Sequence, residues 1–158
     1  YLLQTHEMLF DAHWHGFRVF GGIPERGIYD NMRTAVDRVG RGKERQVNIR
    51  FLAMANHYVF APEFCNPASG WEKGQVEKNV QDARPRLWQP MPNAADLAAL
   101  NAWLERRCQE LWQEIPHGTL PGTIADVLAQ EQAALMPLPA SSSASASVKA
   151  RSPNLVAL

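Results

Sequence analysis

The stretch Arg26-Gly27-Ile28-Tyr29-Asp30-Asn31 decides the fold, because it is a short strand-like run that ends in two polar residues. We expect a strand here that delivers the carboxylate of Asp30 at its C-terminal end. A local alternative stays open, since Asp also forms Asx-turns and caps the N-termini of helices. The stretch therefore predicts either an acid presented at a sheet edge or a turn residue.

A helix is predicted before this strand. Over residues 2–17, apolar residues and histidines recur at intervals of three, four and seven, which places them on one helical face. Gly21 and Gly22 end this helix, and Pro24 prevents it from resuming.

After the strand, the polar residues 36–45 are expected to form a loop or an edge hairpin. A second helix is predicted from Gln46, and four apolar residues share one of its faces: Val47, Phe51, Met54 and Tyr58. A further short strand is predicted at Val59-Phe60-Ala61, before Pro62. Helices and short strands in this order indicate an α/β core.

Turn residues follow from Cys65 to Gly70, and a narrow apolar stripe then predicts a helix, which Pro85 either ends or kinks near Arg84. Two more helices are predicted over about residues 93–112 and 123–135, with Thr123 as the N-cap of the second. The Ser- and Ala-rich sequence after Pro139 is typical of a disordered tail.

Composition excludes several classes of protein. The chain has 158 residues, and 16 basic residues balance 16 acidic ones, so net charge favours neither nucleic acid nor a membrane. No apolar run approaches the ~18 residues of a membrane-spanning helix. Two cysteines build no disulfide framework, so a reducing cytoplasm is expected. Because residue 1 is Tyr, we expect a piece of a longer protein that begins inside a domain.

A second acid, Glu77, lies on one flank of the predicted apolar stripe. By itself it is better explained as a solvated charge paired with Lys73, an interaction of only ~0.2–0.5 kcal/mol. A strand-end Asp30 together with a helix-borne Glu77 is instead typical of a hard-cation site on an α/β sheet. Mg²⁺ is commonly held by one or two carboxylates, and paired ions serve phosphodiester chemistry.

Longer segments surround both acids. The segments around Asp30 are Gly21-Gly22-Ile23-Pro24 and Ile28-Tyr29-Asp30-Asn31-Met32-Arg33-Thr34-Ala35-Val36. The segments before and around Glu77 are His57-Tyr58-Val59-Phe60, Cys65-Asn66-Pro67-Ala68 and Glu72-Lys73-Gly74-Gln75-Val76-Glu77-Lys78. Their order and spacing resemble the IstA-type insertion-sequence transposases of the integrase-core superfamily. The resemblance covers roughly residues 1–139, including the last two helices.

The resemblance implies an α/β fold, an incomplete ribonuclease-H-like integrase core followed by a helical pair. In those terms residues 1–90 would be a partial catalytic core without its first strands, and residues 91–139 a helical extension. Residues 140–158 would be a low-complexity tail, which a frame slip or a truncation explains.

The resemblance also implies a DNA transposase of the DDE type, which cleaves DNA and transfers strands with Mg²⁺ or Mn²⁺. Asp30 would be the second acid of the catalytic Asp, Asp, Glu triad and Glu77 the third, and both would bind the metal. In the family the first acid lies on a strand before the first helix of this chain. Asp11 does not replace it, because Asp11 falls within that helix. The isolated chain is therefore expected to be inactive.

The partners implied are DNA at transposon ends and target, an IstB-type AAA+ ATPase helper, and further copies of the full-length protein in a bacterial cytoplasm. Lys73, Lys78 and Arg84 would contact the DNA backbone, since phosphate contacts supply most non-specific affinity. The alternative for these residues is ordinary solvated charge. Six more basic residues follow Asp30, between Arg33 and Arg50.

Other chemistries are disfavoured. His13 and His15 are two residues apart on a predicted helix and form a poor zinc pair. Cys65 is expected to be a structural thiol rather than a nucleophile activated by His57. Trp71 is expected to pack, with DNA contact as the alternative. Two non-enzymatic alternatives stay open: an inactive remnant that binds DNA or a partner subunit, and an unrelated α/β binding module.

Overall fold

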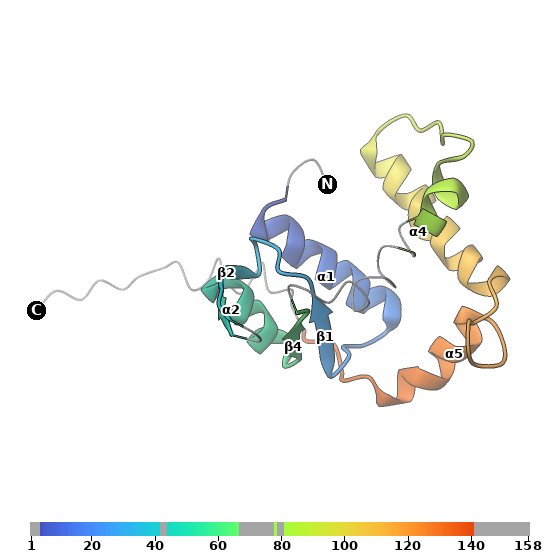
Figure 1. Ribbon diagram of the computed structural model, residues 1–158. Coiled ribbons are helices and arrows are strands. Elements are labelled where there is room, and N and C mark those ends of the chain that lie inside the picture. The colour runs from blue at the N-terminus through green and yellow to red at the C-terminus, as the bar shows by residue number, and fades with distance from the viewer. Residues whose placement is uncertain (1–3, 42–43, 67–77, 79–80, 141–158) are drawn as a thin grey trace, which may run out of the picture. The chain divides into compact units, whose positions relative to one another are not determined.

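The computed structural model of the chain describes residues 4–41, 44–66, 78 and 81–140 (Figure 1). It divides into two compact units. The first comprises Tyr1–Ala68 and Ala134–Leu158, and the second comprises Ser69–Ala133. The tail predicted beyond residue 140 lies outside the described residues.

The first unit begins with helix α1 (His6–Phe20), which confirms the predicted helix. Thr5 caps its N-terminus, because the Thr5 hydroxyl accepts a hydrogen bond from the backbone N–H of Met8 at 3.3 Å. Gly21 ends the helix in the left-handed conformation at φ 81°, which glycine adopts without steric cost.

Strands β1 (Arg26–Tyr29) and β4 (Ala61–Phe64) form a parallel two-stranded sheet (Figure 1). β1 is the strand predicted to deliver Asp30. The strand predicted at residues 59–61 is wrong in its position, because Val59 is the left-handed C-cap of the preceding helix and pairing begins only at Ala61.

Pro62 lies inside β4 because its nitrogen is not needed for pairing. The N–H groups of Ala61 and Cys65 donate to the carbonyl oxygens of Glu25 and Tyr29 at 2.8 and 2.9 Å. Alternate residues of β4 therefore face β1, and the nitrogen of Pro62 is directed away from it. Proline is tolerated at such a position of an edge strand.

Strands β2 (Val36–Val39) and β3 (Arg45–Val47) form an antiparallel hairpin, one of the two predicted alternatives for this polar segment. The prediction that Gln46 and Val47 begin the next helix is wrong, since both belong to β3. Val47 pairs with Val36 of β2 instead of belonging to the apolar stripe of the predicted helix.

Helix α2 (Ile49–Tyr58) begins only after Asn48. The Asn48 side chain accepts hydrogen bonds from the backbone N–H groups of Arg50 and Phe51 at 3.0 and 3.4 Å. These bonds satisfy donors that the first helical turn cannot pair internally. The cap therefore sets where the helix begins.

The core of the first unit is largely aromatic. Its largest fully buried side chains are Tyr58, Phe51, Ile23 and Met54. Phe17 of α1 meets Tyr58 edge to face, with 5.0 Å between ring centroids, and Tyr29 of β1 meets Phe51 at 4.9 Å. Such pairs contribute ~0.5–1.5 kcal/mol beyond the burial of their area. Aromatic contacts thus join α1 and β1 to α2.

The chain returns to the first unit after the second unit is complete. Ile23 and Met136 exchange two backbone hydrogen bonds, at 2.9 and 2.8 Å, as an antiparallel bridge. Met136 and Leu138 then pack against the aromatic core. A Cβ on Gly22 would lie 2.6 Å from the Cβ of Leu135 and 2.9 Å from the carbonyl oxygen of Met136. Only glycine therefore permits this close approach.

The second unit contains helices α4 (Leu97–Glu114) and α5 (Ile124–Glu131), followed by the 3₁₀ turn η1 (Gln132–Ala134). Both helices were predicted. Asp96 caps α4, since its carboxylate accepts a hydrogen bond from the backbone N–H of Ala99 at 2.7 Å.

The predicted N-cap of α5 is confirmed. The Thr123 hydroxyl accepts a hydrogen bond from the N–H of Asp126 at 3.2 Å, and the Asp126 carboxylate accepts one from the N–H of Thr123 at 2.7 Å. This reciprocal arrangement is a capping box, in which two backbone donors at the helix end are satisfied.

Residues 81–88 are helical, so the helix continues past Pro85 and the alternative in which it ends near Arg84 is wrong. The fixed φ of Pro85 is itself compatible with a helix, and the residue is exposed. The structure as a whole is α/β, as predicted, with two small sheets among the described residues. No helix in the described part of the chain is long and apolar enough to cross a bilayer.

Candidate functional site

Asp30 lies directly after the C-terminal residue of β1, at the position predicted for it, and is exposed. One carboxylate oxygen, Oδ1, accepts a hydrogen bond from the backbone N–H of Asn31 at 2.7 Å. The acid is therefore presented at the strand end, as one of the predicted alternatives has it. The alternative in which Asp30 caps a helix is wrong, because the next element after β1 is strand β2.

Asn31 and Arg45 join the C-terminal ends of the two parallel strands. The Asn31 amide Nδ2 donates to the carbonyl oxygen of Cys65 at 3.1 Å, and a terminal nitrogen of the Arg45 guanidinium donates to the same oxygen at 2.9 Å. The Nε of Arg45 donates to the Asn31 Oδ1. These three hydrogen bonds, which we call the strand-end clamp, fix the backbone that carries Asp30.

Beneath the clamp, His13 and Tyr29 form a polar pair within the aromatic core. The His13 Nδ1 lies 2.7 Å from the carbonyl oxygen of Leu9, and its Nε2 lies 2.9 Å from the Tyr29 hydroxyl. A carbonyl can only accept, so Nδ1 carries the proton and Nε2 accepts the hydrogen bond from Tyr29. Burial lowers the pKa of His13 below its ordinary value and raises the pKa of Tyr29 above its own. Both ring nitrogens of His13 are thus engaged in hydrogen bonds within the core.

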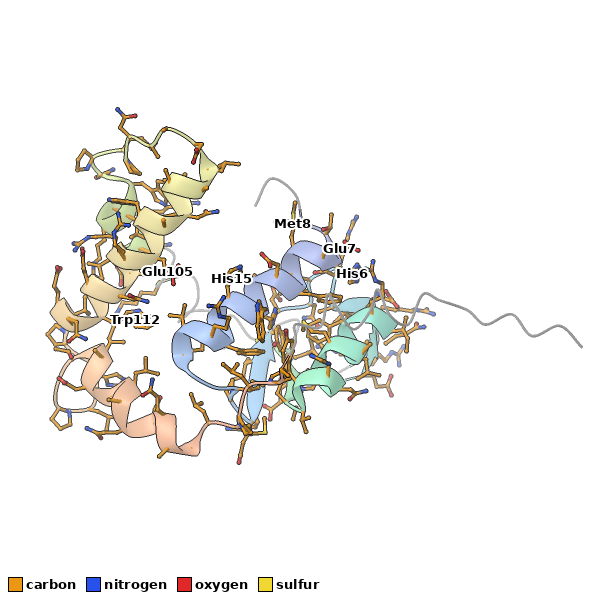
Figure 2. All side chains as sticks on the ribbon, turned by 180° about the vertical axis from the view of Figure 1, so that it is seen from behind. His6, Glu7, Met8, His15, Glu105 and Trp112 are labelled. Carbon is orange, nitrogen blue, oxygen red and sulfur yellow. The ribbon has the colours of Figure 1, made fainter. Side chains whose placement is uncertain are left out.

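The first turn of α1 is fastened to α2 by polar contacts. His6 and Glu7 lie at this end of α1 (Figure 2), and the His6 Nε2 lies 3.0 Å from the Asn48 Oδ1. Arg50 forms an ion pair with Glu7 and lowers the pKa of that carboxyl group to about 2. Both helices are thereby held in place beside β1.

A hollow of about 860 Å³ adjoins Asn31. It lies between the first turns of α1, which contribute Met8 (Figure 2), and the loop that follows Asp30. The loop contributes Asn31, Met32, Arg33 and Thr34. The candidate acid therefore stands next to an open depression whose wall includes a cationic side chain.

The other predicted site residues are only partly described. Glu77 and Lys73 lie outside the described residues, as does Trp71. Lys78 and Arg84 are described and exposed, and they belong to the second unit, whereas Asp30 belongs to the first. The assignment of Asp30, Glu77, Lys73, Lys78 and Arg84 stays a prediction.

Both cysteines are free thiols. Cys65 is a buried free thiol, and the pKa of Cys108 is raised because the side chain is partly buried. In the part of the chain that the structure describes, no three His, Cys, Asp or Glu side chains gather into a metal-binding group. This leaves Asp30 as the acid whose position at a strand end matches the expectation.

The strand-end clamp was missed by sequence reasoning. Arg45 stood in a polar segment that was expected to be a loop or a hairpin, and its hydrogen-bond partners lie 14 and 20 residues away. The available signal was an Asn directly after a strand-end Asp, since such a residue is placed to bond a neighbouring strand end.

Known proteins of similar sequence are transposases. The chain is 74% identical over 137 residues to a protein named "Transposase" from Aminobacter aminovorans, covering 87% of this chain and 27% of that protein. A transposase for insertion sequences IS1326/IS1353 from Pseudomonas aeruginosa is 66% identical over 139 residues, 88% of this chain and 27% of its own length.

A more distant similarity points the same way. A transposase for insertion sequence element IS21 from Pseudomonas aeruginosa is 29% identical over 136 residues, 86% of this chain and 35% of that protein. The chain spans about a quarter of the length of the first two relatives, at 27% each. No protein-family model matches it.

Proposed function

Because this chain is homologous to a segment of the insertion-sequence transposases, we propose that it is part of an enzyme that cleaves DNA and joins the cut strands to a target. The observation that carries this proposal is the exposed carboxylate of Asp30, held at the end of a parallel strand by the strand-end clamp. Phosphodiester chemistry in a metal-dependent enzyme needs an acid presented in this way.

The residues fit a hard divalent cation. Mg²⁺ and Mn²⁺ prefer oxygen ligands, and Asp30 offers an exposed carboxylate beside an open hollow. We assign Asp30 and Glu77 as the protein ligands of the ion, with a further acid supplied by the longer protein. When bound, such ions activate an attacking hydroxyl group and stabilise the leaving oxygen.

The chain's own residues position the acid and the DNA. Asn31 and Arg45 hold the backbone at Asp30, so that the carboxylate does not have to be ordered when substrate arrives. Lys73, Lys78 and Arg84 are assigned to the phosphate backbone.

The longer protein is proposed to act as a multimer on transposon ends, with an IstB-type AAA+ ATPase as its helper, in a bacterial cytoplasm. The alternative, an inactive remnant that at most binds DNA or a partner subunit, makes a different prediction about metal. A remnant without an assembled site gains no stability from Mg²⁺ or Mn²⁺.

The test is metal binding by the 158-residue chain. Mn²⁺ binding is followed by electron paramagnetic resonance, and thermal unfolding is followed during a titration with Mg²⁺. A ligand that binds only the native state adds ~2.7 kcal/mol of stability at a hundredfold excess over its Kd. We expect Asp30→Asn and Glu77→Gln each to remove both the bound Mn²⁺ and the stabilisation.

Asp11→Asn is the matched control, because it removes an exposed carboxylate from the same unit that is not assigned to the metal. It should bind Mn²⁺ as the parent does. A parent chain that unfolds cooperatively yet neither binds Mn²⁺ nor gains stability would contradict the proposed site and favour the remnant.

A further inference from the structure

The segment that follows Asp30 is strongly basic within a chain of zero net charge. Residues 31–50 contain six Lys and Arg residues and only two acidic ones. Three of the arginines lie on the β2–β3 hairpin or its turn: Arg38, Arg41 and Arg45. A local excess of positive charge of this kind attracts a polyanion, even where the whole molecule is neutral.

A β-bulge directs one of these arginines outward. Val36 pairs with Val47, but the next pair along the hairpin is Arg38 with Gln46, so Asp37 is an extra residue on β2. Val36 is buried, and both Arg38 and Gln46 are exposed. Regular alternation would have put Arg38 on the same face as Val36. The bulge thus keeps Val36 in the core and places Arg38 on the outer face.

The hairpin also carries an open hollow of about 580 Å³. Its charged lining consists of Arg38, Arg41, Arg45 and the single acid Glu44. Asp37, the other nearby acid, accepts a hydrogen bond from the Asn48 side chain at 2.8 Å. Among the residues that the structure describes, no carboxylate forms an ion pair with Arg38 or Arg41.

Arg45 connects this basic surface to the candidate acid. It lines the hollow on the hairpin and also donates to Asn31, which lines the larger hollow beside Asp30. A polyanion that lies along the hairpin would therefore run towards the end of β1. This placement is what a substrate phosphate backbone needs in order to reach Asp30.

We propose that the β2–β3 hairpin binds the phosphate backbone of duplex DNA through Arg38 and Arg41, while Arg45 fixes the hairpin beside Asp30. The inference rests on the proposed function and adds a DNA contact in the first unit to those assigned to Lys73, Lys78 and Arg84. Guanidinium groups match phosphate oxygens in a two-pronged geometry, and phosphate contacts position DNA without reading its sequence.

The test measures binding of the full chain to a fluorescein-labelled duplex of arbitrary sequence by fluorescence anisotropy, over a range of KCl concentrations. Each phosphate contact contributes ~0.9 to the slope of log K against log salt. The double variant Arg38→Gln/Arg41→Gln should make that slope less negative by ~1.8 and weaken binding roughly ten- to a hundredfold near 0.1 M salt.

The matched control is Arg18→Gln/Arg106→Gln, which removes the same charge from exposed positions on α1 and α4. It should leave the slope near that of the parent. Far-UV circular dichroism and thermal unfolding check that both double variants fold, which is expected because all four side chains are exposed.

A third double variant, Lys78→Gln/Arg84→Gln, separates the failure of this inference from that of the proposed function. If this variant weakens binding and the hairpin variant does not, the hairpin proposal is overturned and the proposed function stands. A parent chain that shows no salt-dependent binding at low salt contradicts both. Polyglutamate serves as a second probe, in place of DNA. If the hairpin variant loses polyglutamate binding but keeps its DNA binding, the surface is assigned to an acidic protein and the proposal is overturned.

Discussion

Among the residues that the structure describes, Val59 is the one non-glycine residue with a positive φ. It is the C-cap of α2 with φ 61° and ψ 24°, a left-handed conformation in which a β-branched side chain is strained. Its side chain is 74% exposed, so it recovers little by burial. Glycine is the usual residue at this position of a helix end.

We therefore expect Val59→Gly to raise the free energy of unfolding of the first unit by about 1 kcal/mol, because relief of the left-handed strain exceeds the extra chain entropy of glycine. Chemical denaturation measures the change. Val59→Ala, which keeps a Cβ in the same conformation, is the control and should give little gain. A loss of stability in the glycine variant would contradict this prediction. It would show that contacts of the Val59 side chain stabilise the fold by more than the left-handed strain costs.

His13 makes the first unit sensitive to acid. Burial lowers its pKa below 6.5, so the folded chain keeps this side chain neutral at pH values where the unfolded chain takes up a proton. The stability that the folded chain gains at high pH from keeping His13 neutral is fully present above about pH 6.5. It is lost as the pH falls from there towards the folded pKa. The free energy of unfolding should fall in this window by up to ~1.4 kcal/mol per pH unit.

Denaturation between pH 7.5 and 5 measures this slope. The variant His13→Gln should be less stable at neutral pH, and its slope in the window should be flatter than that of the parent. His15→Gln alters an exposed histidine of the same helix and should keep the parent slope. An unchanged slope in His13→Gln would assign the acid sensitivity to another group.

At the scale of elements, local signals predicted most of the fold. α1, β1, α4 and α5 were all expected, because caps, glycine stops and apolar periodicity lie within a few residues of the elements they define. β4 was misplaced, because its start depends on the conformation of Val59 and on pairing with β1. Pairing between distant segments leaves no such local mark.

In the candidate site, too, the sequence predicted the features that depend on neighbouring residues and not those that depend on distant pairing. Asp30 could be placed at a strand end from the sequence, since the strand and its polar end are adjacent. The strand-end clamp could not, because Arg45 and Cys65 meet only after β1 and β4 have paired and the hairpin has closed. Glu77 stays a prediction, outside the described residues.

The capping box of α5 gives a prediction for the second unit. Thr123→Ala removes the hydroxyl that accepts from the N–H of Asp126, which should destabilise the helix by ~0.5–2 kcal/mol. Native-state hydrogen exchange of the α5 amides measures this locally. Thr119→Ala, at an exposed threonine outside both helices, is the control. Equal protection in the two variants would mean that tertiary packing, rather than the cap, holds α5.

On the scale of the whole molecule, the return of the chain to the first unit depends on Gly22. We expect Gly22→Ala to lower the free energy of unfolding of this unit by more than about 2 kcal/mol, because the new methyl group would overlap the side chain of Leu135 and the carbonyl oxygen of Met136. Thermal unfolding and limited proteolysis near residue 136 both report the effect.

Gly16→Ala is the matched control for this substitution. Gly16 lies inside α1, and apart from its chain neighbours and the backbone of its own helix no atom lies within 4 Å of a Cβ built on it. Alanine should therefore stabilise the helix by ~0.5–1 kcal/mol. Wild-type stability in Gly22→Ala would show that residues 134–140 contribute little to the first unit.

The bridge between Ile23 and Met136 also has a consequence during synthesis. A ribosome that has just made Cys65, the last buried core residue before the second unit, must translate about 70 further residues before Met136 exists. At ~5–20 residues per second this takes roughly 4–14 s. Throughout that interval the nascent first unit has Ile23 without its backbone partner, and it is then that a chaperone would have the most exposed surface to bind.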